Sequence, residues 1–141
     1  MEGMHRCRKS SRALAAALVL IAAGCADRPD QHQAAIGPEW VAADVAGAGV
    51  AAGSRITLQL GADGRASGRG GCNAYTGAYT LQGTELHFGA MAATKMACAP
   101  AVMEQEQRYF TALAAVSRYG LADDGALMLT TPDGKTILFR K

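Results

Sequence analysis

Cysteine is the residue type that offers the most chemistry in this sequence. The four cysteines are Cys7, Cys25, Cys72 and Cys98, and His87 lies between the last two. A thiol with a base beside it can act as a nucleophile, whereas two thiols in an oxidising compartment form a disulfide. The compartment therefore decides what these cysteines can do, and the N-terminal sequence indicates the compartment.

The first 24 residues differ in composition from the rest of the chain. An uncharged run of 11 residues, 13–23, follows four basic residues, which are Arg6, Arg8, Lys9 and Arg12. A basic segment followed by a short apolar segment is typical of a secretory signal peptide. A helix that spans a bilayer needs about 20 predominantly apolar residues, so a permanent transmembrane helix is the weaker interpretation.

Small residues lead up to Cys25 in the run Ile21-Ala22-Ala23-Gly24-Cys25. This run resembles the lipobox that the lipoprotein signal peptidase cleaves, with Ala22 where the pattern usually has leucine. The resemblance implies that residues 1–24 are removed and that Cys25 becomes an acylated first residue. Cleavage after Ala26 by the ordinary signal peptidase is the alternative.

The signal therefore predicts a cell-envelope protein whose first partner is the membrane, reached through its lipid anchor. Ala26, in place of an aspartate, follows the cysteine, and by analogy with enteric sorting this favours the periplasmic face of the outer membrane. Residues 25–38 are predicted to be the acylated cysteine and a flexible tether, because 26–38 is polar, has two prolines and lacks an apolar period. Residues 39–141 are then one monomeric domain.

Charge argues against nucleic acid as a partner. Removing residues 1–24 takes away four of the 14 Lys and Arg residues and one of the 12 Asp and Glu residues, which leaves the mature chain near −1. A nucleic-acid-binding domain needs lysine and arginine clustered on one face. The near-neutral mature chain lacks the excess of lysine and arginine that such a face requires.

Alternating polarity and glycine turns predict an antiparallel sheet. Ile56, Leu58 and Leu60 alternate with polar residues within 54–60, as in a half-buried strand. Asp-Gly pairs at 63–64, 124–125 and 133–134 separate extended runs, as in hairpins of a meander. The strands expected after the first are 65–71, 77–81, 85–88, 119–122, 126–130 and 136–140.

One segment, from Pro100 to about Ser117, has helical periodicity instead. It contains no glycine and repeats apolar residues at spacings of three, four and seven. Pro100 suits the first turn, and Glu104 and Glu106 lie near the positive end of the helix dipole. The apolar stripe, consisting of Val102, Met103, Tyr109, Phe110, Leu113 and Val116, is expected to pack on the sheet; a ligand groove is the alternative.

Only Cys72 and Cys98 remain as free thiols once Cys7 is removed and Cys25 is acylated. In an oxidising compartment this pair is predicted to form a disulfide. The rival hypothesis makes one of them a nucleophile with His87 as base, but no third, orienting group is evident. A zinc site is disfavoured because no metal-ligand spacing is present. We expect His87 to be an ordinary residue at a sheet surface, and we expect neither a cofactor nor a catalytic residue set.

The glycine-rich run 68–71 does not match a phosphate-binding loop, because it lacks both the G-x-G-x-x-G and the G-K-[ST] patterns. Glycines at these positions favour a bulge or a close backbone crossing. Arg65 and Arg69 share one strand face and are expected to be solvated, with an anionic lipid contact as the alternative. Asn73 is expected to be a turn residue whose side chain bonds the backbone.

Several short motifs in a fixed order resemble the META domain of HslJ-like proteins. They are a G-C-N element at 71–73, G-x-Y at 77–79 and T-x-M-A-C at 94–98, followed by the helix and the closing strands, over about 40–139. The resemblance implies an α+β fold in which a strongly bent antiparallel sheet, a meander that is partly barrel-like, packs on one amphipathic helix. It also implies a role in envelope stress or antibiotic tolerance.

We therefore expect a non-catalytic binding or structural module whose partner is an unidentified envelope protein or envelope component. An inhibitor or a hydrolase of envelope substrates is the alternative. A deep pocket lined by convergent polar groups would favour the enzyme.

Overall fold

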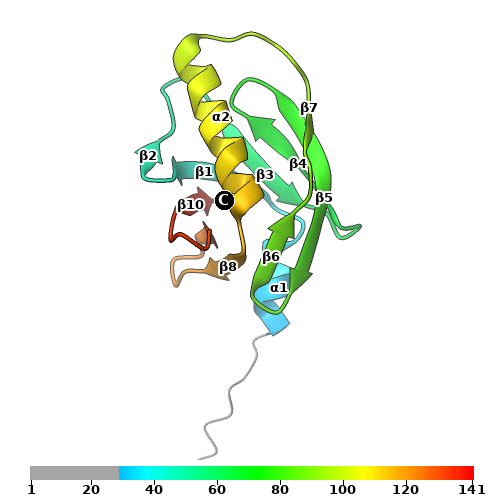
Figure 1. Ribbon diagram of the computed structural model, residues 1–141. Helices are drawn as coiled ribbons and strands as arrows, with labels where there is room; N and C mark the ends of the chain where they lie inside the picture. Colours follow the sequence, from blue (N-terminus) through cyan, green and yellow to red (C-terminus); the bar gives the residue numbers. More distant parts are fainter. Residues whose placement is uncertain (1–28) are drawn as a thin grey trace, which may run out of the picture.

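The computed structural model describes residues 29–141, which form a rolled antiparallel sheet with a long helix, α2, packed against it (Figure 1). The strand order is β10-β9-β8-β6-β5-β4-β3-β1-β2, and β10 also pairs with β1, so eight of the ten strands form a closed ring. The strands are β1 Glu39–Val45, β2 Ala48–Gly49, β3 Ile56–Leu60, β4 Arg65–Gly70, β5 Ala74–Gln82, β6 Glu85–Phe88, β7 Ala92–Ala93, β8 Arg118–Leu121, β9 Leu127–Thr130 and β10 Thr136–Arg140. The expected α+β fold with a bent, barrel-like antiparallel sheet on one amphipathic helix is confirmed.

The three predicted Asp-Gly turns join neighbouring strands. Gly64, Gly125 and Gly134 have φ of 78°, 78° and 84°, a left-handed conformation that glycine adopts without steric cost. These turns link β3 to β4, β8 to β9 and β9 to β10. The meander expected from the sequence is therefore present.

Strand β1 closes the ring and was not among the expected strands. Its Trp40 pairs with Leu58 of β3, and its Ala42 pairs with Phe139 of β10. The register shifts between Ala42 and Asp44, and such an irregularity breaks the two-residue period by which strands are recognised. The strand that joins the two ends of the sheet is thus the one whose sequence pattern is weakest.

Helix α2, Pro100–Ala115, supplies one side of the core. Its buried residues are Gln105, Glu106, Tyr109, Ala112 and Leu113. Met103 and Phe110, which belong to the predicted stripe, are only half-buried. The helix ends two residues earlier than expected because the Ser117 amide donates to the Thr130 carbonyl and the chain turns into β8. The core around it consists of Trp40, Ile56, Leu58, Leu60, Leu86, Leu127, Leu129, Ile137 and Phe139.

The segment predicted to be a tether contains a second helix, α1, Pro29–Ala35. Ala35 is completely buried, and its carbonyl accepts a hydrogen bond of 3.0 Å from the Trp40 indole. Farther along, the Gly37 amide donates to the Leu60 carbonyl. The predicted flexible tether is therefore too long, because from Pro29 onward the chain is folded onto the domain. Seven residues are too few for a stable isolated helix, so packing rather than local sequence holds α1.

The two ends of the molecule carry different elements. Helix α1 lies at one end of the rolled sheet, and the loop that precedes α2 lies at the other (Figure 1). Within 29–141, neither helix is long and apolar enough to cross a membrane.

Candidate functional site

The predicted disulfide between Cys72 and Cys98 is confirmed. Their Cα atoms are 6.0 Å apart, and the bridge spans 26 residues of sequence. It connects the turn after β4 to the loop that leads into α2. The other two cysteines, Cys7 and the predicted lipidation residue Cys25, lie outside the described residues.

Next to the disulfide, the carboxylate of Glu106 is buried and serves as the acceptor for the turn at 72–73. One carboxylate oxygen accepts the Cys72 and Asn73 amides at 3.0 and 2.7 Å, and the other accepts the Asn73 side-chain amide at 2.6 Å. Glu106 is 5% exposed. A buried carboxylate is tolerated only when hydrogen bonds replace its water, and these three donors do so.

Asn73 continues this network to the loop before α2. Its side-chain oxygen accepts the Met96 amide at 2.6 Å and the Thr94 hydroxyl at 2.9 Å. The expectation that the Asn73 side chain bonds the backbone of its surroundings is met. Together with the disulfide, these bonds fix both sides of the T-x-M-A-C segment to the turn after β4.

From the sequence, Glu106 was expected only to interact with the positive end of the helix dipole, and Gln105 was not a candidate. Gln105 is 1% exposed; its oxygen accepts the Ala51 amide at 2.5 Å, and its nitrogen donates to the Ser54 hydroxyl at 2.7 Å. Both residues lie three or four positions before Tyr109, on the face that packs inward. That spacing was the available signal, because a polar residue in phase with the apolar stripe must find buried partners.

Two tyrosines form a second buried polar contact between sheet and helix. The hydroxyls of Tyr75 and Tyr109 are 2.6 Å apart, and Tyr75 donates to the Thr57 carbonyl at 2.8 Å. Burial raises the pKa of both phenols above the ordinary value, and the neighbouring Tyr75 adds to the increase at Tyr109. Both hydroxyls are thus held neutral in the core.

Because the pKa values of Tyr75 and Tyr109 are raised in the folded state, the free energy of unfolding should decrease as the pH rises into the alkaline range. The unfolded tyrosines lose their protons near pH 10 while the folded ones retain them, so stability is fully present below about pH 10 and falls above it. Replacing Tyr75→Phe should flatten this fall by about 1.4 kcal/mol per pH unit, and should cost about 1 kcal/mol at pH 7 through the lost hydrogen bonds. Urea unfolding at pH 7, 10 and 11 measures both effects; identical pH slopes for the variant and the wild type would contradict this assignment.

The structure also shows where the other candidate residues from the sequence lie. His87 lies on the exposed face of β6, opposite Thr80 of β5. A Cβ at Gly70 would lie 2.9 Å from the Glu106 carboxylate, so the strand and the helix approach each other closely at this glycine. Strand β4 pairs with both neighbouring strands without a bulge. Arg65 and Arg69 are exposed, and their guanidinium groups donate to the Thr76 hydroxyl and the Cys72 carbonyl.

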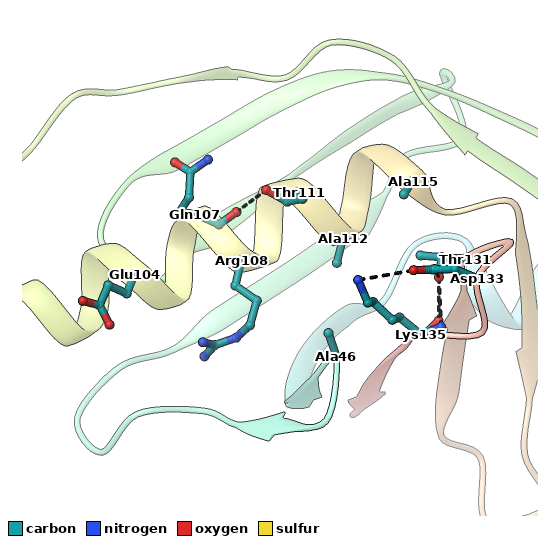
Figure 2. Close-up of a pocket in the computed structure, with 10 residues that line it drawn as sticks. All are labelled: Ala46, Glu104, Gln107, Arg108, Thr111, Ala112, Ala115, Thr131, Asp133 and Lys135. Atoms are coloured by element: carbon teal, nitrogen blue, oxygen red, sulfur yellow. Dashed lines mark hydrogen bonds and ion pairs between the residues drawn. The ribbon is translucent and has the colours of Figure 1, made fainter.

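Residues 29–141 bring together no group of three His, Cys, Asp or Glu side chains that could hold a metal ion. A groove of about 430 Å³ lies between α2, the β1–β2 turn and the β9–β10 turn. Arg108 reaches into this groove from the helix, and Lys135 reaches in from the β9–β10 turn (Figure 2). We refer to it as the α2 groove; its lining residues are Ala46, Glu104, Gln107, Arg108, Thr111, Ala112, Ala115, Thr131, Asp133 and Lys135.

These features define a class: small α+β modules in which one helix packs against a rolled antiparallel sheet, and in which the G-C-N turn, the T-x-M-A-C loop and a buried helix carboxylate are tied together. The sequence model of the META domain matches residues 33–141, and the chain belongs to this family. The match begins within α1, in agreement with the packing of that helix on the domain.

Solved structures of similar proteins share the fold. One is the NMR structure of a protein from Burkholderia xenovorans, which is 29% identical, with 95% of this chain and 96% of that chain covered and a TM-score of 0.62. A second NMR structure is 25% identical, with coverage of 72% and 86% and a TM-score of 0.59. None of the curated proteins compared with this chain shows significant similarity.

Proposed function

We propose that this protein is a monomeric, non-catalytic META-type module, anchored by a lipid on Cys25 at the periplasmic face of the outer membrane, that binds an envelope component and helps to maintain the envelope under stress. The observation that carries the non-catalytic part is the use of the buried polar side chains. Glu106, Asn73 and Gln105 each bond backbone or side-chain groups that fix the fold. A group held in this way is unsuited to exchange protons with a substrate.

The alternative proposal, a hydrolase or an inhibitor of envelope substrates, would use the α2 groove. A hydrolase needs a nucleophile with a free lone pair and an adjacent base. The groove hydroxyl next to a carboxylate belongs to Thr131, which donates to Asp133 and accepts the Lys135 amide at 3.0 Å. Because Thr131 is only 4% exposed, its hydroxyl is closed to an incoming substrate, and the groove favours binding over hydrolysis.

Anchoring would place the domain close to the membrane. Three residues, 26–28, separate Cys25 from the first residue of α1. At a maximum of about 3.5 Å per residue, the four steps from Cys25 to Pro29 reach roughly 14 Å. The α1 end of the molecule would therefore face the lipid, and the loop with the disulfide would face away from it.

Replacing Cys25→Ser should release the protein from membranes, because the serine hydroxyl cannot carry the thioether-linked lipid. We expect the wild type in the membrane fraction after cell disruption, and the variant in the soluble fraction. Immunoblots of both fractions measure this result. Wild-type protein that is soluble in the absence of detergent would contradict the anchor.

The same pair of variants tests the envelope role. A deletion strain under detergent or antibiotic stress should regain growth with the wild-type protein and not with Cys25→Ser. Equal growth of the deletion and wild-type strains under all such stresses would contradict a role in envelope maintenance.

A further inference from the structure

We propose that the α2 groove binds the free C-terminus of a short peptide with small side chains, with Arg108 as the partner of its carboxylate. This inference rests on the proposed binding function and names the chemical class of the ligand. Three features of the groove support it: an arginine without a partner in the described part of the chain, a second cation on the opposite wall with two acidic side chains nearby, and alanine methyl groups on both sides.

Arg108 is the residue in 29–141 that has a buried side-chain polar atom without a hydrogen-bond partner. Its Nε atom is buried and has no hydrogen-bond partner among the described residues, and none of their ion pairs involves its guanidinium group. Glu104 precedes it by four residues, a spacing at which helical ion pairs form, yet its side chain points away (Figure 2). The outer nitrogens of the guanidinium group are therefore free of partners within 29–141, and a planar carboxylate is the acceptor that they fit best.

Lys135 supplies a second positive charge on the opposite wall. Its Nζ lies 3.2 Å from the Asp133 carboxylate, and the Thr131 hydroxyl accepts its backbone amide. The turn that carries Lys135 is thus held by its own hydrogen bonds. Glu104 and Asp133 balance the two cations around the groove, so a single carboxylate is favoured over a polyanion, which these two acids would repel.

The apolar part of the groove lining consists of small side chains. Ala112 and Ala115 contribute methyl groups from α2, and Ala46 contributes one from the β1–β2 turn across from it (Figure 2). The volume is within the range of small-molecule sites. Ala46 has φ of 55°, a left-handed conformation that is unfavourable for a residue other than glycine. The Ala46 amide donates to the Thr136 carbonyl at 2.8 Å. The β1–β2 hairpin has a two-residue turn, in which Gly47 also has a positive φ, of 84°. The Ala46 methyl group is therefore held in place at the edge of the groove by its own turn.

Calorimetric titration of the full-length protein, purified in detergent from whole-cell extracts, with acetyl-Ala-Ala and with its C-terminal amide tests this site. We expect the acid to bind and the amide to bind at least tenfold more weakly, because the amide cannot neutralise Arg108. Arg108→Gln should weaken the acid by roughly tenfold to a hundredfold without lowering the thermal unfolding midpoint, since it removes an unsatisfied group. Arg65→Gln, at an exposed arginine outside the groove, should leave affinity unchanged.

The L and D forms of the peptide distinguish the source of the ligand. Tighter binding of the D form would indicate a cell-wall stem peptide, and tighter binding of the L form a protein C-terminus; either result supports the site. Equal affinity for acid and amide, no binding of either, or unchanged affinity in Arg108→Gln would overturn it. These results are independent of lipidation, so failure of the anchor proposal and failure of this one can be told apart.

Discussion

Glu106→Ala is expected to destabilise the domain by about 4 kcal/mol. The substitution removes the acceptor of three donors, the Cys72 amide, the Asn73 amide and the Asn73 side chain. Each buried donor left without a partner costs about 1–3 kcal/mol, and the total falls short of the full sum where water can enter. The free energy of unfolding from urea titration measures the loss.

Glu104→Ala is the matched control for this prediction. It removes the same side chain two residues earlier on α2, where Glu104 is exposed, and should change stability by less than about 0.5 kcal/mol. Glu106→Gln, which keeps the shape and one acceptor oxygen, should fall between the two. Equal stability of the Glu106→Ala and Glu104→Ala variants would show that the carboxylate does not hold the G-C-N turn.

Loss of the Cys72 to Cys98 bridge is expected to cost about 3.5 kcal/mol. The bridge closes a segment of 26 residues that contains β5, β6 and β7. In the chain-entropy description, opening a loop of that length restores about this much free energy to the unfolded chain. Cys98→Ser, at an exposed position, is the clean variant, because no core group is replaced.

Three comparisons check this assignment. Cys72→Ala and the double variant should each show nearly the loss seen in Cys98→Ser, since either change removes the same constraint. Reducing agent should lower the stability of the wild type by a similar amount and leave the double variant unchanged. If Cys72→Ala alone abolished a measurable enzymatic activity at unchanged stability, the nucleophile hypothesis would replace the structural one.

Much of the sheet could be predicted from local sequence. The hairpins follow Asp-Gly pairs, because these fix both the turn and the strands on either side. Strand β1 was missed because the register shift near Ala42 interrupts its period. Helix α1 was missed because it depends on a buried contact between Ala35 and Trp40, which composition alone does not reveal.

The candidate site, like the fold, could be predicted only in part from the sequence. The disulfide followed from counting the cysteines that remain after export. The α2 groove could not be predicted, because Ala46, Arg108 and Lys135 come from three segments that only the closed sheet brings together. The role of Glu106 was hidden because an acidic residue in the first half of a helix is expected on the grounds of the dipole alone.

The measurement that tests the central claim most directly is the intact mass of the wild-type protein extracted from cell envelopes. The account predicts a chain that begins at Cys25 and carries a covalently attached diacylglycerol, with the Cys72 to Cys98 disulfide intact. An unmodified chain that begins at Asp27, as cleavage after Ala26 would produce, would contradict it.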